Sequence, residues 1–193
     1  MLSATMEKKS ISPLTGNEYI IPENPTDKEG IDAFIAANPG KKVVVVQGLG
    51  FVGSVMSLVV ANALTEEYAV IGIDLPTPLS YWKIRSINEG IFPVVADDPK
   101  IGQFYQQARK KNNLYATFDP HAYSKADIIV VDINLDVQKQ SNGNGQLENY
   151  NVDLTPFKKA VASIGANCKP DVLVLVETTV PPGTCAKVVK PIL

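Results

Sequence analysis

Short apolar runs alternate with longer segments of helical periodicity from Lys42 to the end of the chain. The runs VVVV, IIVV and VLVLV contain no polar position, which is typical of strands covered by helices on both faces of a parallel sheet. Each run therefore predicts a buried strand. The predicted strands are Lys42–Gln47, Tyr68–Asp74, Leu114–Thr117, Asp127–Ile133 and Asp171–Thr178.

Helical patterns fill the segments between these strands. Alternation of strands and helices with right-handed crossovers predicts an α/β fold of the Rossmann type, a doubly wound parallel sheet with helices on both faces. The predicted helices are Phe51–Thr65, Leu79–Asn88, Lys100–Lys111, Pro120–Ser124 and Asp153–Cys168, with another that begins near Thr184.

The first 41 residues differ from this pattern, and we predict that they form an N-terminal arm and helix outside the Rossmann-type domain of residues 42–193. Residues 1–25 are polar and contain several prolines. Thr26 and Glu29 have the spacing of a capping box, which predicts a helix start. The helix has one apolar face, formed by Ile31, Phe34 and Ile35, and Asn38-Pro39-Gly40 ends it.

A second polar stretch, Lys139–Asn151, is predicted to be a long loop, either a disordered excursion or a lid beside a ligand. The formal net charge of −2 argues against a nucleic-acid or membrane-surface partner. Cys168 and Cys185 have no metal-type spacing, so we expect no metal site and no disulfide framework. No apolar run reaches the length of a membrane span, and the N-terminus has no signal-peptide core, which together favour a cytoplasmic protein.

The glycine-rich turn GLGFVG, residues 48–53, lies between the first predicted strand of the sheet and a helix. Gly48 permits the tight turn, Gly50 allows a pyrophosphate to approach the backbone, and Gly53 allows close packing of the helix on the strand. Free amides and the helix dipole then face the phosphates. The predicted cofactor-binding residues of this turn are Gly48, Leu49, Gly50, Phe51, Val52 and Gly53.

The second strand of the sheet ends at Asp74, 21 positions after Gly53 (74 − 53). A carboxylate at this place accepts hydrogen bonds from both adenosine ribose hydroxyls and repels a 2′-phosphate, which favours NAD over NADP. Three other interpretations remain open. The turn could be purely structural, with a solvated Asp74, or the site could bind FAD, or it could bind S-adenosylmethionine.

Four segments together resemble the N-terminal domain of the UDP-glucose/GDP-mannose dehydrogenase family, the nucleotide-sugar 6-dehydrogenases. They are GLGFVG, KIRSINEGIFP from Lys83 to Pro93, ADIIVVDI from Ala126 to Ile133, and VETTVPPGT from Glu177 to Thr184. The resemblance extends from Lys42 to the end of the chain, and the last segment is the most specific.

The resemblance implies roles for two further residues. Lys83 would help to bind the adenosine-side hydroxyls or phosphates beside Asp74, although a surface lysine is an equal alternative and the LPTPLSYW insertion lengthens the spacing. Thr179 would lie beside the nicotinamide and the reacting sugar carbon, the alternative being a local backbone hydrogen bond. The chain departs from the family pattern at Leu135, where a threonine is usual, and at Ala96-Asp97-Asp98.

The resemblance also implies a reaction and a partner. Family members oxidise the C6 alcohol of a nucleotide sugar twice with NAD, through a cysteine-bound intermediate, and supply uronic acids for polysaccharide synthesis. The catalytic cysteine, the central helix and the sugar-nucleotide domain lie beyond the threonine turn, so we expect Cys168 and Cys185 to be structural. The expected identity is the NAD-binding domain of a UDP-hexose or UDP-N-acetylhexosamine dehydrogenase that is homo-oligomeric when intact, while these 193 residues alone bind NAD weakly without turnover.

Two rival interpretations remain at this point. A β-hydroxyacid dehydrogenase relative would share the glycine turn and the sheet, but TVPPGT argues against it. A non-catalytic NAD-sensing or interaction domain would use the N-terminal arm and helix for docking.

Overall fold

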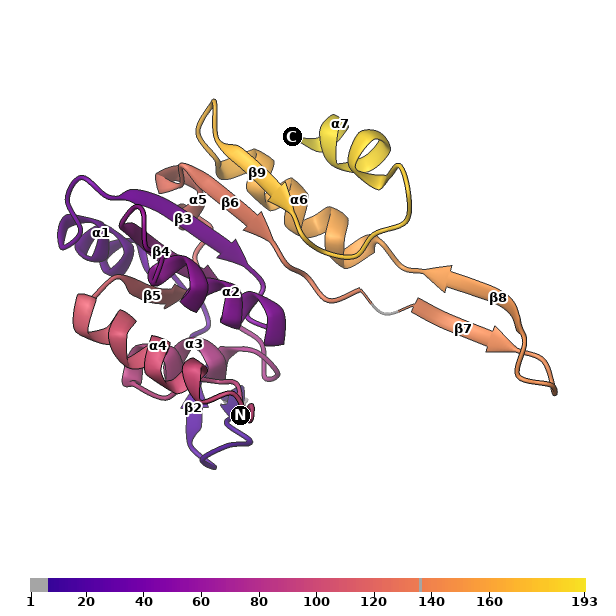
Figure 1. Ribbon diagram of the computed structural model, residues 1–193, viewed down its shortest axis with the longest axis horizontal. Helices are drawn as coiled ribbons and strands as arrows, with labels where there is room; N and C mark the ends of the chain where they lie inside the picture. Colours follow the sequence, from indigo (N-terminus) through magenta and orange to yellow (C-terminus); the bar gives the residue numbers. More distant parts are fainter. Residues whose placement is uncertain (1–6, 136) are drawn as a thin grey trace, which may run out of the picture.

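The computed structural model describes residues 7–135 and 137–193, which form a parallel sheet covered by helices on both faces (Figure 1). The five strands lie in the order β5-β4-β3-β6-β9, all parallel. The order reverses between β3 and β6, as in a doubly wound sheet, so the predicted fold class is confirmed. The strand bounds are β3 Lys42–Gln47, β4 Tyr68–Ile73, β5 Leu114–Thr117, β6 Ile128–Val131 and β9 Leu173–Val176.

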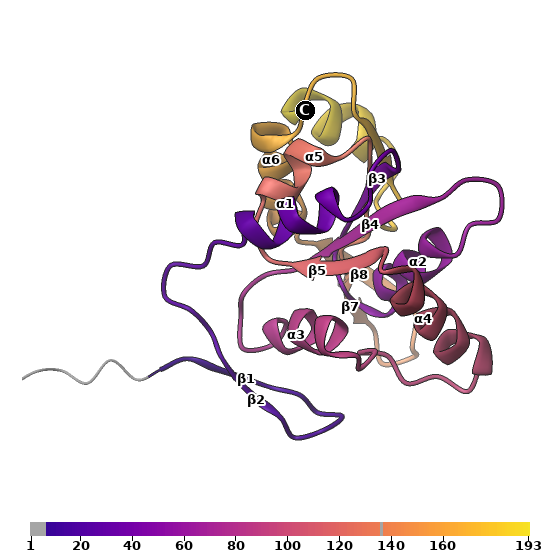
Figure 2. The ribbon, with the colours of Figure 1, turned by 90° about the vertical axis from the view of Figure 1, so that its left-hand side faces the viewer.

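Alternate side chains of each strand enter different cores, as the pleat of a strand requires. Val43 and Val45 of β3 belong to the cluster beneath α1, α5 and α6, whereas Val44 and Val46 pack on the side of α2 and α4. Figure 2 shows these two helix layers on opposite sides of the sheet. The helix bounds are α1 Lys28–Ala36, α2 Phe51–Ala61, α3 Tyr81–Glu89, α4 Pro99–Lys111, α5 His121–Lys125, α6 Thr155–Asn167, the π-helical turn η1 Cys185–Val189, and α7 Lys190–Ile192.

Helix α1 forms where the sequence predicts it, with Ile31 and Phe34 buried, but the predicted capping box is wrong. The N-cap is Asp27, with no side-chain cap hydrogen bond recorded there among the described residues. The Thr26 hydroxyl instead donates to Asp119 Oδ2 at 3.1 Å, because the start of α5 places a carboxylate beside it. The Asp27 carboxylate accepts from the hydroxyls of Tyr115 and Thr117, which ties α1 to β5.

Two hairpins lie where the polar pattern did not predict strands. The predicted loop Lys139–Asn151 is wrong: its residues lie in the antiparallel hairpin of β7 (Val137–Ser141) and β8 (Leu147–Val152), which extends away from the sheet (Figure 1). Asn142 forms the turn, since its side-chain oxygen accepts from the amides of Asn144 and Gln146. The N-terminal arm forms a second hairpin, β1 (Lys9–Ile11) and β2 (Glu18–Ile20), which packs against α3.

Within the described residues, no helix combines the length and apolar character needed to cross a bilayer.

Candidate functional site

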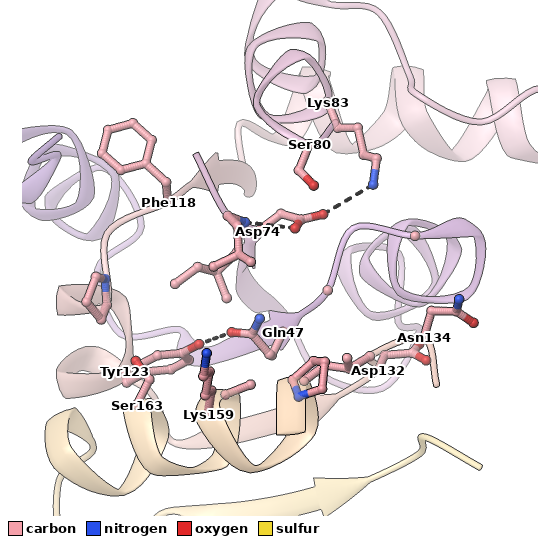
Figure 3. A pocket seen from close by; sticks show the side chains of 18 of the residues that line it. Gln47, Asp74, Ser80, Lys83, Phe118, Tyr123, Asp132, Asn134, Lys159 and Ser163 are labelled. Atoms are coloured by element: carbon pink, nitrogen blue, oxygen red, sulfur yellow. Dashed lines mark hydrogen bonds and ion pairs between the residues drawn. The ribbon is translucent and has the colours of Figure 1, made fainter. Parts of the chain in front are cut away.

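A pocket of about 680 Å³ lies at the carboxyl ends of the central strands (Figure 3). The glycine turn after β3, the end of β4, the start of α3, the loop after β5, the segment after β6 and the first turns of α6 all contribute to its walls. Ligands of open α/β sheets bind in this crevice, where loops after neighbouring strands diverge to opposite faces.

The three glycines of the turn have different surroundings. Gly48 has a φ of +102°, and a Cβ there would overlap the carbonyl oxygen of Asp132. A Cβ on Gly53 would overlap the Gly48 carbonyl, so both positions require glycine for the fold itself. A Cβ on Gly50 meets no atom within 4 Å, although Gly50 lines the pocket. The open space over Gly50 is where a phosphate could approach the backbone.

The remaining residues of the turn are divided between the core and the surface. Leu49 is buried in the apolar cluster beneath α3, whereas Phe51 and Val52 are more than half exposed. Gly48 and Gly50 are the two turn residues that line the pocket within the described chain. Helix α2 begins after Gly50 with no side-chain cap in the described structure, so its first amides and positive dipole end are available to an anion.

Asp74 and Lys83 lie together at the pocket wall, as the family resemblance implies. The Asp74 carboxylate accepts from the amides of Leu49 at 3.2 Å and Leu75 at 2.8 Å. Lys83 Nζ lies 3.3 Å from Asp74 Oδ2, and both side chains are largely buried (Figure 3). The LPTPLSYW insertion folds into a turn in which the Thr77 carbonyl accepts from the amides of Ser80 and Tyr81. The pair of Asp74 and Lys83 forms in spite of the insertion.

Around Asp74 the pocket combines an apolar wall with a polar floor. Phe118 supplies part of the wall, and its ring lies 5.8 Å from that of Tyr81. The Tyr123 hydroxyl donates to Gln47 on the floor, and burial raises the pKa of Tyr123, which keeps this donor protonated. Figure 3 shows Lys159 reaching from α6 toward this pair. The wall suits a flat aromatic base and the floor suits its polar edge.

Asp132, at the end of β6, is a pocket residue that the sequence analysis did not single out. Its Oδ2 atom is buried and has no hydrogen-bond partner among the described residues. Burial raises the pKa of the Asp132 carboxyl, and the negative charge of Glu177 raises it further. The sequence could have pointed to Asp132 by its position, because Asp132 follows a buried strand just as Asp74 does.

We expect Asp132→Asn to tighten NAD binding at pH 7 by about two- to tenfold, because it removes a negative charge from the pocket that would receive the phosphates. In the unsubstituted protein, lowering the pH through the raised pKa of Asp132 neutralises the same charge and should also tighten binding. Calorimetric titrations from neutral pH down to the lowest pH at which the chain remains folded would test this. Identical dissociation constants and pH profiles for the two proteins would place Asp132 away from the bound phosphates.

The two threonine hydroxyls of the turn after β9 have different surroundings. Thr178 is buried, and its Oγ1 accepts from the Ile133 amide at 2.8 Å and donates to the Val131 carbonyl at 3.2 Å. Thr178 therefore links the end of β9 to β6. Thr179 is exposed and does not belong to the described residues that line the pocket. Cys168 and Cys185 likewise lie outside this lining.

A family model described as "UDP-glucose/GDP-mannose dehydrogenase family, NAD binding domain" matches residues 41–193. Protein CapL of Staphylococcus aureus is 26% identical over 151 residues, covering 78% of this chain and 30% of its own length. UDP-glucose 6-dehydrogenase 1 of Glycine max is 28% identical over 145 residues, covering 74% of this chain and 28% of its own length. The chain thus spans less than a third of these relatives.

Two solved dehydrogenase structures are also similar to this chain. GDP-mannose dehydrogenase from Pseudomonas aeruginosa is 29% identical, with a TM-score of 0.60 over 77% of this chain and 31% of that one. NDP-N-acetyl-D-galactosaminuronic acid dehydrogenase from Methanosarcina mazei Go1 is 23% identical, with a TM-score of 0.66 over 84% of this chain and 32% of that one. The second likeness supports the fold alone. The glycine turn, the uncapped α2 and the strand-end carboxylate fit the NAD that the family model names.

Proposed function

Since the chain belongs to the UDP-glucose/GDP-mannose dehydrogenase family through its NAD-binding domain, we propose that the pocket binds the adenosine half and the pyrophosphate of NAD. We further propose that it does so for the oxidation of the C6 alcohol of a UDP-sugar, a hexose or an N-acetylhexosamine, to a uronic acid. The names of the relatives support a nucleotide sugar as the substrate class.

One observation carries the proposal: the open space over Gly50, the uncapped start of α2 and the Asp74 carboxylate border a single pocket. The first two suit the pyrophosphate, and the third suits the adenosine ribose hydroxyls. Phe118 would contact the adenine face. Lys83 would neutralise part of the charge of Asp74 and leave the carboxylate oriented toward the ribose.

Bound NAD supplies a hydride acceptor, and the protein orients it and excludes water around it. We place the nicotinamide end toward β6 and β9, because the adenosine-side residues occupy the opposite part of the crevice. Thr179 follows β9 and would then lie beside the reacting sugar carbon, as the family resemblance implies. Homo-oligomeric assembly of the intact enzyme, a cytoplasmic location and a role in polysaccharide synthesis belong to the same proposal.

We expect the 193-residue chain to bind NAD weakly and to form no NADH from UDP-glucose, UDP-N-acetylglucosamine or GDP-mannose. The reason is that neither Thr179 nor either cysteine lies among the described pocket residues, so no side chain expected to position the sugar alcohol or to hold the aldehyde is placed there. Calorimetry would measure binding, and NADH absorbance would measure turnover, with an intact family member as positive control. Steady NADH formation would refute the inactivity of this chain, whereas the absence of any NAD binding would refute the proposed function.

A further inference from the structure

The N-terminal hairpin of β1 and β2 precedes the residues that match the family model, yet it packs beside the nucleotide pocket. The central residue of β1 is Ser10, which is fully buried. Ser10 Oγ donates to the Pro78 carbonyl at 2.8 Å and accepts from the Trp82 amide at 2.9 Å. One hydroxyl therefore holds both the loop between β4 and α3 and the first turn of α3.

The segment held by Ser10 carries part of the pocket wall. Ser80 lies between the two residues that Ser10 contacts, and Lys83 directly follows Trp82. Both line the pocket, and Lys83 pairs with Asp74. A shift of this segment would move the lysine relative to the carboxylate proposed to bind the adenosine ribose.

Apolar packing connects the hairpin to two other parts of the pocket. Tyr19 and Ile21 lie in one buried cluster with Trp82 and with Leu49 of the glycine turn. Phe118, which forms the apolar wall, packs against the same cluster. The hairpin is thus part of the packed layer that supports the adenosine side.

The far end of α3 is also attached to the hairpin. The Tyr19 hydroxyl donates to Glu89 Oε2 at 3.0 Å, and Glu89 pairs with Arg85 at 2.8 Å. The hairpin therefore contacts both ends of α3, which fixes the helix along its length.

We infer that Ser10 is a positioning residue for the nucleotide pocket, and that the N-terminal hairpin sets the affinity for the adenosine side of NAD. The inference rests on the proposed function. Its physical basis is preorganisation: a segment already ordered by Ser10 loses less conformational freedom when the ligand binds.

Ser10→Ala is the direct test, in the full 193-residue chain. We expect the dissociation constants of NAD and of ADP-ribose to rise by the same factor, about three- to tenfold, while that of nicotinamide mononucleotide stays unchanged. Trp82 is the only tryptophan of the sequence, so its fluorescence reports on the surroundings of the residue whose backbone amide Ser10 accepts from. Thermal unfolding monitored by circular dichroism would define a temperature at which each variant is folded.

Ser12→Ala is the matched control. Ser12 is equally buried and lies in the same hairpin, but its side chain accepts from the amide of Leu14 within the hairpin turn. We expect it to lower the melting temperature without changing the affinity for ADP-ribose. If Ser10→Ala does not fold, Ser10→Cys keeps a weaker donor and acceptor of similar size and should bind ADP-ribose with intermediate affinity.

Unchanged ADP-ribose affinity in the folded Ser10 variant would overturn the inference, as would an equal loss in the Ser10 and Ser12 variants. An equal loss for nicotinamide mononucleotide would also overturn it, because the effect would not be confined to the adenosine side. Failure of the unsubstituted chain to bind NAD would refute the proposed function, and the inference with it.

Discussion

Gly50→Ala is expected to weaken NAD binding by about ten- to hundredfold while leaving the fold intact. Gly50 has φ −71° and ψ −166°, a conformation that alanine adopts without strain. The added methyl group enters open space rather than the protein. It would occupy the space through which the pyrophosphate approaches the backbone. The substitution should therefore lower the affinity for NAD without lowering the stability of the folded chain.

Calorimetry with NAD and thermal unfolding would separate these two effects. Gly102→Ala is the matched control, since Gly102 lies in α4 and its Cβ would also meet open space. We expect both variants to melt at or slightly above the temperature of the unsubstituted protein, because alanine reduces the entropy of the unfolded chain. Equal NAD affinities for the two variants would show that Gly50 does not face the pyrophosphate.

Asp74→Ala is expected to weaken NAD binding by about tenfold or more and to improve NADP binding relative to NAD. The ribose hydroxyls lose their acceptor, and the repulsion of a 2′-phosphate disappears. Lys83, released from its pair with Asp74, can then contact that phosphate. Competition titrations with both dinucleotides would measure the change in preference.

Asp127→Ala provides a matched control at the amino ends of the central strands, opposite the ends that border the pocket. Asp127 also binds a backbone amide, that of Val43 at 2.8 Å, and a lysine, Lys169 at 2.6 Å. Both substitutions should lower the free energy of unfolding, but only the change at Asp74 should alter the preference between dinucleotides. An unaltered preference in Asp74→Ala would remove Asp74 from the ribose site.

The central sheet and the glycine turn could be predicted because their signals are local. Buried parallel strands need continuous apolar runs, so β3 occurs at its predicted bounds. The glycine turn and Asp74 follow from strand ends, whose place in a doubly wound sheet is fixed by topology. The pairing of Lys83 with Asp74 came from the family resemblance rather than from the pattern.

The features that were missed depend on contacts between distant segments. Ser10 and Pro78 are 68 positions apart, so nothing local in the polar arm signals that hydrogen bond. The Thr26 hydroxyl donates to Asp119, 93 positions away, instead of capping helix α1. Asp132 looks like an ordinary strand-end acid until the fold buries one of its oxygens.

The crystal structure of this chain bound to NAD would test the central claim most directly. The account predicts the pyrophosphate against the Gly50 backbone at the start of α2, and the adenosine ribose hydroxyls within hydrogen-bond distance of Asp74. It also predicts the adenine beside Phe118, in the pocket between α3 and α6. Electron density that places the adenosine outside this pocket, or the phosphates away from the glycine turn, would contradict it.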